Sequence, residues 1–186
     1  TFTFDDPGGH TAQCRSLSHD AITSPRLYTG PVAYASVNPA VERRFAATVH
    51  RATGKRPHRL GRDFPAAIRN RYRPPSAAGL DRLANAAAAW WLTRRACVVV
   101  DLGTAITFDI VNARGEFIGG MIAPGLRLQA QALHNHTALL PGVAPSRVRR
   151  AVARTTREAI SAGVSFGIEG LIRTARTLYA DEPLAV

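Results

Sequence analysis

Residues 98–111, VVVDLGTAITFDIV, constrain the fold more than any other stretch of the chain. Two apolar runs rich in β-branched residues flank an Asp-Leu-Gly-Thr segment, which predicts two neighbouring strands joined by a tight turn. An ordinary hairpin turn needs no carboxylate at the end of a buried strand, because burying an unpaired charge there costs free energy. These residues therefore raise the question of what the carboxylate is for.

The turn between the two runs is a candidate ligand-binding segment. Gly103 lets a ligand come close to the backbone, Thr104 offers a hydroxyl donor, and Asp101 brings a carboxylate to the same edge of the sheet. This combination suits phosphate oxygens and a cation that neutralises them. Taken alone, however, the four residues are more typical of a structural turn, and that alternative stays open.

The rest of the sequence predicts an α/β protein. The expected strands and helices alternate along the chain: a hairpin within 1–17, a strand at 31–37, a helix from Pro39 closed by Gly54, a short strand and irregular loop at 56–75, a helix within 76–95, strands at 96–100, 105–111 and 116–123, a helix with Pro124 just inside its start that runs to about His134, and a long basic helix at 155–179. This order predicts two related halves that meet near residue 96.

Composition narrows the class of protein. The 186 residues and their 46% hydrophobic content suit a globular protein with a substantial core. No apolar run approaches the roughly 20 residues needed to span a bilayer. Cys14 and Cys97 are too few for a disulfide framework or a thiolate zinc site. We therefore expect a cytoplasmic protein without a membrane span.

The net charge of +11 comes almost entirely from arginine, since Lys55 is the only lysine. Such a charge favours an anionic partner, either a nucleic acid or a small metabolite. Arginine usage driven by genome composition explains it equally well. The charge therefore narrows the choice of partner only weakly.

Asp81, in the segment AAGLDRL at residues 77–83, is a second candidate carboxylate. It follows a glycine and begins a predicted helix, so its side chain is placed to enter a cleft. An acidic residue in the first turn of a helix more often only interacts favourably with the helix dipole. Both interpretations stay open on local grounds.

Three other patterns do not indicate sites. The segment GVSFG at 163–167 matches the nucleophile-elbow pattern but lies in a predicted helix with no strand before it. His134 and His136 are two residues apart and would point in different directions on a helix, which makes them a poor metal pair. Trp90 and Trp91 are interpreted as core or interface aromatics.

Several segments, taken together and in order, resemble the type III pantothenate kinases. They are AGLDRLANAAAAW, VVVDLGTAITFDIV, GEFIGGMIAPGLRLQAQAL, TALLP and, further along, TTREAISAGVSFGIEGLI. The resemblance covers most of residues 31–175 and is most specific from Gly79 to Pro141. It implies two related actin-like (ribonuclease H-like) domains, residues 1–96 and 97–186, around a nucleotide cleft.

The resemblance also implies an activity and roles for individual residues. The expected reaction transfers the γ-phosphoryl group of ATP to the primary hydroxyl of pantothenate, giving 4'-phosphopantothenate in the first step of coenzyme A biosynthesis. Asp81 would be the general base, Asp101 would bind a monovalent cation (K⁺ or NH₄⁺), and ATP would enter with Mg²⁺. The remaining residues would bind ligands: Gly103 and Thr104 the nucleotide, and Tyr72, Gly79, Leu80, Arg82 and Thr156 pantothenate. The family is usually homodimeric and needs neither membrane nor nucleic acid.

Two parts of the family pattern find no match in this sequence. These are the opening Asp-x-Gly-Asn-Thr/Ser phosphate loop and a C-terminal strand with a glycine pair, so we expect both domains to be incomplete here. The sequence is either part of a longer protein or an inactive paralogue that acts as a regulatory factor binding nucleic acid or protein. The arginines that motivate the second alternative are Arg147, Arg149, Arg150, Arg154 and Arg157. A solvated helix face explains them equally well.

Overall fold

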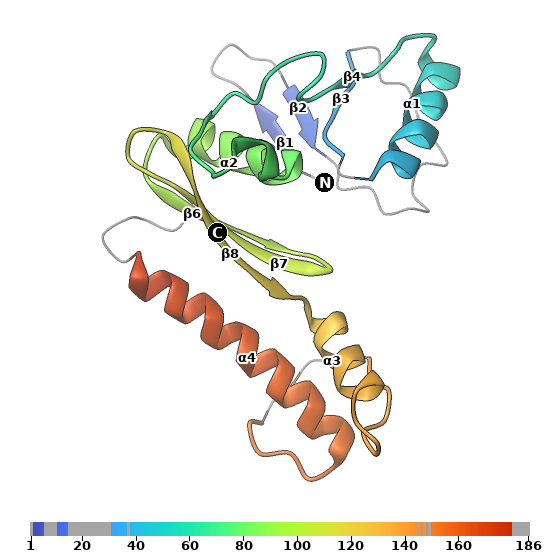
Figure 1. The fold of residues 1–186 in the computed structure, drawn as a ribbon, viewed down its shortest axis with the longest axis vertical. Helices are drawn as coiled ribbons and strands as arrows, with labels where there is room; N and C mark the ends of the chain where they lie inside the picture. Colours follow the sequence, from blue (N-terminus) through green and yellow to red (C-terminus); the bar gives the residue numbers. More distant parts are fainter. Residues whose placement is uncertain are drawn as a thin grey trace. The chain divides into compact units, whose positions relative to one another are not determined.

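The computed structural model describes residues 2–5, 11–14, 31–36, 38–144, 146, 148 and 150–179 (Figure 1). The chain divides into two compact units, residues 1–65 and 66–186. The domain boundary predicted between residues 96 and 97 lies inside the second unit and stays a prediction.

The first unit contains two small sheets. Strands β1 (Phe2–Asp5) and β2 (Thr11–Cys14) pair antiparallel, which confirms the predicted hairpin, and its Pro-Gly-Gly turn lies outside the described residues. Strands β3 (Ala33–Tyr34) and β4 (His58–Arg59) pair in parallel. A parallel pair needs a crossover connection, and the helix α1 supplies it.

Helix α1 (Pro39–Thr53) begins and ends where the sequence predicts. The Asn38 side chain accepts hydrogen bonds from the first backbone N–H groups, and Pro39 occupies a position that needs no N–H donor. Gly54 ends the helix with a φ of 68°, which glycine adopts without strain. All of these signals are local, so they can be predicted from the sequence.

The second unit is built on a four-stranded sheet. Its strands are β5 (Arg69–Asn70), β6 (Cys97–Leu102), β7 (Ala105–Val111) and β8 (Glu116–Pro124), in the order β5-β8-β7-β6. The last three strands form a continuous antiparallel meander, and β5 pairs in parallel with β8. The three strands predicted around residues 96–123 are therefore confirmed.

Pro124 ends a strand, and the prediction that it lies just inside a helix is wrong. It pairs with Ala105 as the last residue of β8, where proline is tolerated because no further ladder N–H is needed. Helix α3 (Leu126–Asn135) begins two residues later, and the carbonyl of Pro124 accepts a hydrogen bond from Gln129.

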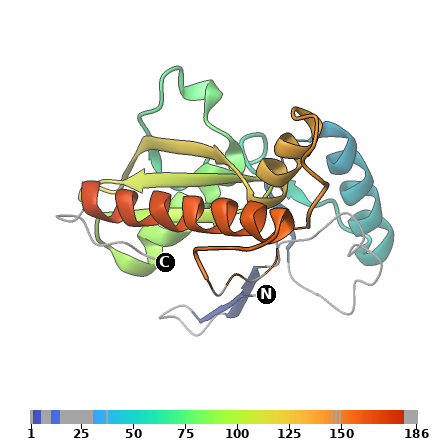
Figure 2. The same cartoon turned by 90° about the horizontal axis from the view of Figure 1, so that it is seen from below.

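Helices cover both faces of this sheet. A short 3₁₀ helix, η2 (Pro75–Ala77), leads into α2 (Leu80–Thr93), which packs on the face formed by Cys97, Val111 and Phe117. Helix α4 (Thr156–Leu178) covers the other face, where it packs against Val98, Ile106, Phe108 and Ile110. Figure 2 shows α4, in red, lying alongside the strands. The alternation of strand residues between the two cores follows from the two-residue period of a β-strand.

Helix α4 agrees with the predicted helix at 155–179. The Thr155 side chain accepts a hydrogen bond from the backbone N–H of Glu158, which fixes the helix start. In the described part of the chain, no helix combines the length and apolar character required to cross a membrane. The predicted mixed α/β class is confirmed, whereas the actin-like arrangement of two domains around a cleft stays a prediction.

Candidate active site

Asp81 is exposed and lies in the first turn of α2. The backbone N–H of Arg82 donates to its Oδ1 at 2.9 Å. A Cβ at Gly79 would lie 2.5 Å from the same oxygen, so glycine there leaves room for the carboxylate. Among the described residues, Oδ2 of Asp81 has no hydrogen-bond partner. One oxygen is therefore anchored and the other can accept a proton from a ligand.

Arg82 points into the protein and forms an ion pair with Asp109 of β7. Its Nε donates to Asp109 Oδ1 at 2.7 Å, and its Nη2 lies 2.6 Å from that oxygen in a charge contact. Both residues are buried, and Asp109 is completely so. Thr107 Oγ1 donates to Asp109 Oδ2 at 3.1 Å. The pair therefore joins the helix that carries Asp81 to the centre of the sheet.

The environment shifts the pKa values of this pair. Burial raises the pKa of the Asp109 carboxyl above its usual value, although the Arg82 guanidinium and the Thr107 hydroxyl act in the opposite direction. Burial alone would lower the pKa of Arg82, but the hydrogen bond and the charge of Asp109 raise it. Arg82 consequently stays cationic beside Asp81.

Two aromatic rings lie against the Arg82 guanidinium. Its Cζ is 5.5 Å from the ring centroid of Tyr72 and 5.5 Å from that of Phe117, within the range of cation–π attraction. The two rings are themselves 6.0 Å apart. A Cβ at Gly119 would lie 3.6 Å from the Tyr72 ring, an ordinary van der Waals distance, so the ring lies next to β8. Of the predicted pantothenate residues, Tyr72 thus lies against Arg82, and Gly79, Leu80 and Arg82 flank Asp81 in the chain.

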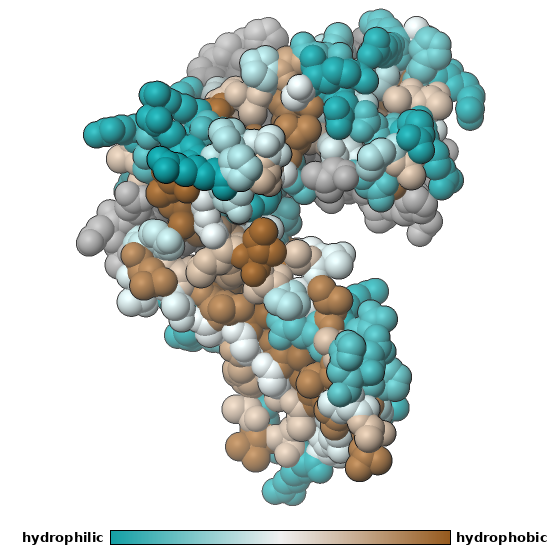
Figure 3. Space-filling view, viewed as in Figure 1, coloured by the Kyte–Doolittle hydropathy of each residue, from teal (hydrophilic) through white to brown (hydrophobic). Residues whose placement is uncertain are grey.

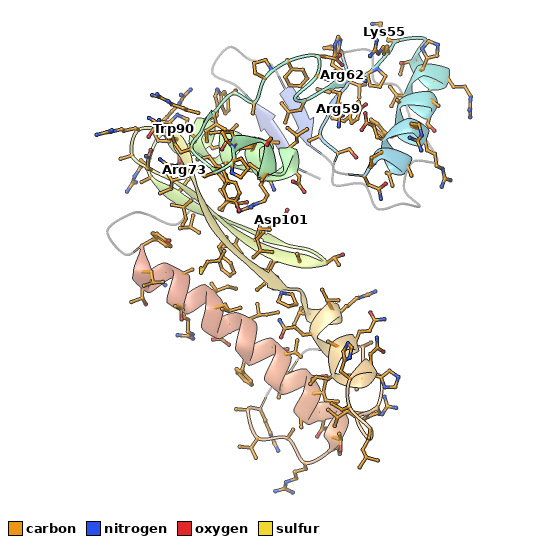
Figure 4. The ribbon with its side chains drawn as sticks, in the orientation of Figure 1. Lys55, Arg59, Arg62, Arg73, Trp90 and Asp101 are labelled. Atoms are coloured by element: carbon orange, nitrogen blue, oxygen red, sulfur yellow. The ribbon has the colours of Figure 1, made fainter. Side chains whose placement is uncertain are left out.

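Asp101 lies on the same face of the sheet as Asp109, because Asp101 pairs with Thr107, which is two positions before Asp109 on β7. Asn85, one helical turn after Asp81, donates its Nδ2–H to Asp101 Oδ2 at 3.1 Å. Figure 4 shows the labelled Asp101 on the side of the hairpin that faces α2. Asp101 is exposed near the end of β6. The helix that carries Asp81 therefore covers the sheet face that carries Asp101, and it also supplies the amide that binds Asp101.

Gly103 and Thr104 form the exposed turn between β6 and β7. The N–H of Gly125 donates to the carbonyl of Thr104 at 2.8 Å, and a Cβ at position 125 would lie 2.2 Å from the Gly103 carbonyl oxygen. Gly125 is the N-cap of α3, so the positive end of that helix begins beside the turn. The predicted nucleotide segment lies at the same end of β6 as Asp101.

Thr156 lies apart from these residues. It is the first residue of α4, on the opposite face of the sheet from α2, and it lines an open groove of about 690 Å³ between α3 and α4. Figure 3 shows apolar side chains gathered over this part of the unit, and Leu128, Leu133 and Leu139 are exposed there. Within one chain, the structure does not bring Thr156 to Asp81.

Several features of the site were not predicted from the sequence. They are Asn85, Thr107, Asp109 and Phe117. A signal was present in β7, since a charged residue in the middle of an apolar strand requires a partner. Which residue that partner is cannot be derived from a strand pattern, because Arg82 is 27 positions away.

The structure also shows where the three patterns lie that the sequence analysis did not interpret as sites. Residues 163–167 lie inside α4, so the nucleophile-elbow geometry is absent there. His134 Nδ1 is 2.9 Å from the Leu140 carbonyl, and the described residues include no group of three His, Cys, Asp or Glu side chains suited to a metal ion. Trp90 packs against the α2 core beneath Gly115, whereas Trp91 is exposed.

Comparisons with known proteins define the class of the chain. A family model described as type III pantothenate kinase matches residues 8–177. Proteins named type III pantothenate kinase from Persephonella marina and Syntrophotalea carbinolica are 41% identical over 142 residues and 36% identical over 159 residues. A third, from Chlorobium luteolum, is 46% identical over 110 residues. The chain is therefore of the kinase class. It belongs to the type III pantothenate kinase family.

The chain spans only part of these relatives. The three alignments cover 74%, 83% and 56% of this chain but 56%, 62% and 41% of the respective relatives. A crystal structure from Campylobacter jejuni, titled as a Baf family transcriptional activator, matches with a TM-score of 0.51 at 24% identity. That match covers 80% of this chain and 65% of the other, and it supports the fold alone.

Proposed function

We propose that the protein containing this chain transfers the γ-phosphoryl group of ATP to the primary hydroxyl of pantothenate, the first step of coenzyme A biosynthesis. The observation that carries the proposal is that α2, which carries Asp81, packs on the sheet face that carries Asp101 and binds Asp101 through Asn85. Phosphoryl transfer depends mainly on positioning and charge neutralisation, and this face offers an acceptor of protons and a ligand for a cation.

Asp81 is the proposed general base. The N–H of Arg82 holds its Oδ1, so Oδ2 is the oxygen that would take the proton from the substrate hydroxyl as the oxygen attacks the γ-phosphorus. A general base contributes about 10²- to 10⁴-fold to a rate. The remainder would come from alignment of the hydroxyl and from stabilisation of the phosphoryl charge.

Arg82 and its neighbours are the proposed pantothenate contacts. Pantothenate carries a carboxylate, and the cationic Arg82 next to Asp81 offsets the repulsion that an anionic substrate would meet there. Tyr72, Gly79 and Leu80 surround the same position, with Tyr72 held against Arg82 by a ring contact. These residues would orient the substrate so that its hydroxyl meets Asp81.

The donors near Asp101 fit a monovalent cation. Asp101 is an exposed hard oxygen ligand with one oxygen engaged by Asn85, and the described residues supply no three-ligand cluster of the kind that holds a metal ion tightly. K⁺ or NH₄⁺ bound there would partly neutralise nearby phosphate charge. Gly103 and Thr104, beside the start of α3, are the proposed contacts of ATP, which would enter with Mg²⁺.

Thr156 is a proposed pantothenate contact only within a homodimer. Because Thr156 and Asp81 lie on elements that cover opposite faces of the sheet, one chain alone does not join them. The apolar groove lined by Thr156 would suit contact with a second subunit. The predicted cytoplasmic location likewise stays a prediction.

The proposal is tested with the full-length gene product. We expect ATP-dependent formation of 4'-phosphopantothenate in potassium buffer, measured by mass spectrometry. Asp81→Asn should lower kcat by about 10²-fold or more, because the amide cannot accept the proton. Glu169→Gln is the matched control, since the partner of Glu169 among the described residues is Arg173, on the surface of α4.

Two results would contradict the proposal. A folded wild-type protein that does not phosphorylate pantothenate excludes the reaction. Full activity of Asp81→Asn excludes Asp81 as the base.

The alternative of an inactive regulatory paralogue predicts salt-dependent binding to DNA without any response to pantothenate. Of the arginines that motivate it, Arg147 and Arg149 lie outside the described residues, and Arg157 donates to the Gly142 carbonyl.

A further inference from the structure

Asp109 is a buried carboxylate to which the family resemblance assigns no role here. We propose that Asp109 is a positioning residue for pantothenate recognition, which fixes the Arg82 guanidinium beside Asp81. The inference rests on the proposed function, because it concerns the same site. Its evidence is the geometry around Arg82, which is independent of the roles of Asp81 and Asp101.

The carboxylate of Asp109 has both of its oxygens in contact with partners. Asp109 is fully buried at the centre of the sheet, and its Oδ1 meets both Nε and Nη2 of Arg82. Its other oxygen accepts the Thr107 hydroxyl. Both carboxylate oxygens are therefore used, and the side chain has no freedom to turn away from Arg82.

The neighbouring strand β8 also shapes the surroundings of Asp109 and Arg82. Asp109 pairs across the ladder with Gly120 of β8. A Cβ at Gly120 would clash with the carbonyl oxygen of Phe108, so the glycine lets β8 approach the β7 backbone closely beside Asp109. The Tyr72 and Phe117 rings, each 5.5 Å from the Arg82 Cζ, close in on the guanidinium. Three elements thus act together to fix one side chain.

Stability alone does not account for the buried pair of Arg82 and Asp109. A buried ion pair is commonly no more stabilising than a well-packed apolar pair of similar volume. Stability alone therefore gives no reason to place an aspartate in the middle of an apolar strand. A fixed orientation of Arg82 does give a reason, because the Nε edge is occupied by Asp109 and the backbone N–H of the same arginine anchors Asp81.

The inference predicts a specific kinetic defect in Asp109→Asn. The amide keeps the shape of the side chain but loses the charge that holds Arg82, so pantothenate would bind against a poorly placed guanidinium. We expect the KM for pantothenate to rise roughly 10- to 100-fold, with the KM for ATP changed less than about twofold. The decrease in kcat should be smaller than the increase in the pantothenate KM.

Glu116→Gln is the matched control. Glu116 is also a buried carboxylate paired with arginine in the same sheet, but its partners are Arg69 and Arg71, outside the proposed site. We expect its pantothenate KM to equal that of the wild type. Thermal unfolding and circular dichroism of both variants show whether any kinetic change arises from loss of the fold.

A double-mutant cycle tests whether Asp109 acts through Arg82. We expect Arg82→Gln to raise the pantothenate KM, and the double variant Arg82→Gln/Asp109→Asn to raise it no further. Arg82→Gln could fail to fold because it leaves the Asp109 charge unpaired. In that case the double variant, whose two amides are both neutral, is measured in place of the single variant. Its pantothenate KM should then be close to that of Asp109→Asn.

The outcomes separate this inference from the proposed function. Absence of pantothenate phosphorylation by the wild type overturns the proposed function and the inference with it. An active wild type together with an unchanged pantothenate KM in Asp109→Asn overturns the inference alone. So do a defect limited to thermal stability, equal increases in both KM values, and fully additive effects in the cycle.

Discussion

Two clusters of carboxylate and arginine in the same sheet have similar chemistry but different surroundings. In the first, Arg82 and Asp109 have side-chain exposures of 9% and 0%. In the second, Glu116 is 9% exposed, but its partners Arg69 and Arg71 are 67% and 46% exposed. The first joins α2 to β7, whereas the second joins β5 to the start of β8.

This difference shows which cluster the site depends on. Water can solvate Arg71 if its partner is removed, but it cannot reach Asp109 if Arg82 is removed. Glu116 also accepts a hydrogen bond from Asn112, so its charge has a second source of stabilisation. The helix that carries Asp81 is therefore held by the buried pair of Arg82 and Asp109. If that pair is broken, water cannot solvate the remaining charge.

The largest expected effect is a difference in the free energy of unfolding between variants of the two clusters. Arg82→Leu should lower the free energy of unfolding by about 3–5 kcal/mol, because it leaves an unpaired buried charge. Arg71→Leu should lower it by about 1 kcal/mol or less, because the pair is exposed on the arginine side. Urea denaturation of the two variants measures both values. Equal losses would mean that burial does not distinguish the clusters.

A second prediction compares the amides that hold two carboxylates. Asn85 donates to Asp101 in the proposed site, and Asn112 donates to Glu116 outside it. Asn85→Ala should raise the K⁺ concentration for half-maximal activity by roughly tenfold, which corresponds to one charge-assisted hydrogen bond of about 1.5 kcal/mol. Asn112→Ala should leave that concentration unchanged.

The measurement is a titration of turnover with potassium chloride at constant ionic strength maintained with sodium chloride. The Asn112→Ala variant controls for a general loss of stability. If Asn85→Ala keeps the potassium dependence of the wild type, Asp101 either does not bind the cation or does not need Asn85 to do so.

Local signals explain how much of the fold could be predicted. The caps at Asn38, Gly54 and Thr155 depend on a few neighbouring residues, so the helices next to them were correctly placed. Pro124 was misplaced because its local preference for a helix start competes with pairing in the β7–β8 ladder. That pairing involves residue 105 and is not visible in the local pattern.

In the candidate site too, contacts between residues close in sequence could be predicted, and contacts between distant residues could not. Gly79, Leu80, Asp81 and Arg82 are contiguous, so one motif suffices to predict that they lie together. The pairing of Arg82 with Asp109 joins residues far apart in sequence, and it depends on which strand α2 covers. Sequence periodicity predicts which face of a strand is polar, but it does not name the partner across the core.

The smallest predicted effect is on the pH dependence of stability, where Glu116 and Asp109 should contribute with opposite signs. Hydrogen bonds from Asn112 and Arg71 lower the pKa of Glu116 from 4.5, so its stabilisation is fully present above that pH and is lost on acidification. Burial raises the pKa of Asp109 from 3.8, so the folded protein binds more protons there and stability falls as the pH rises through this window. Between pH 3 and pH 7, the stability deficit of Glu116→Gln relative to the wild type should therefore grow, and that of Asp109→Asn should shrink. Urea unfolding at several pH values measures both trends, and parallel curves would show that the two environments titrate alike.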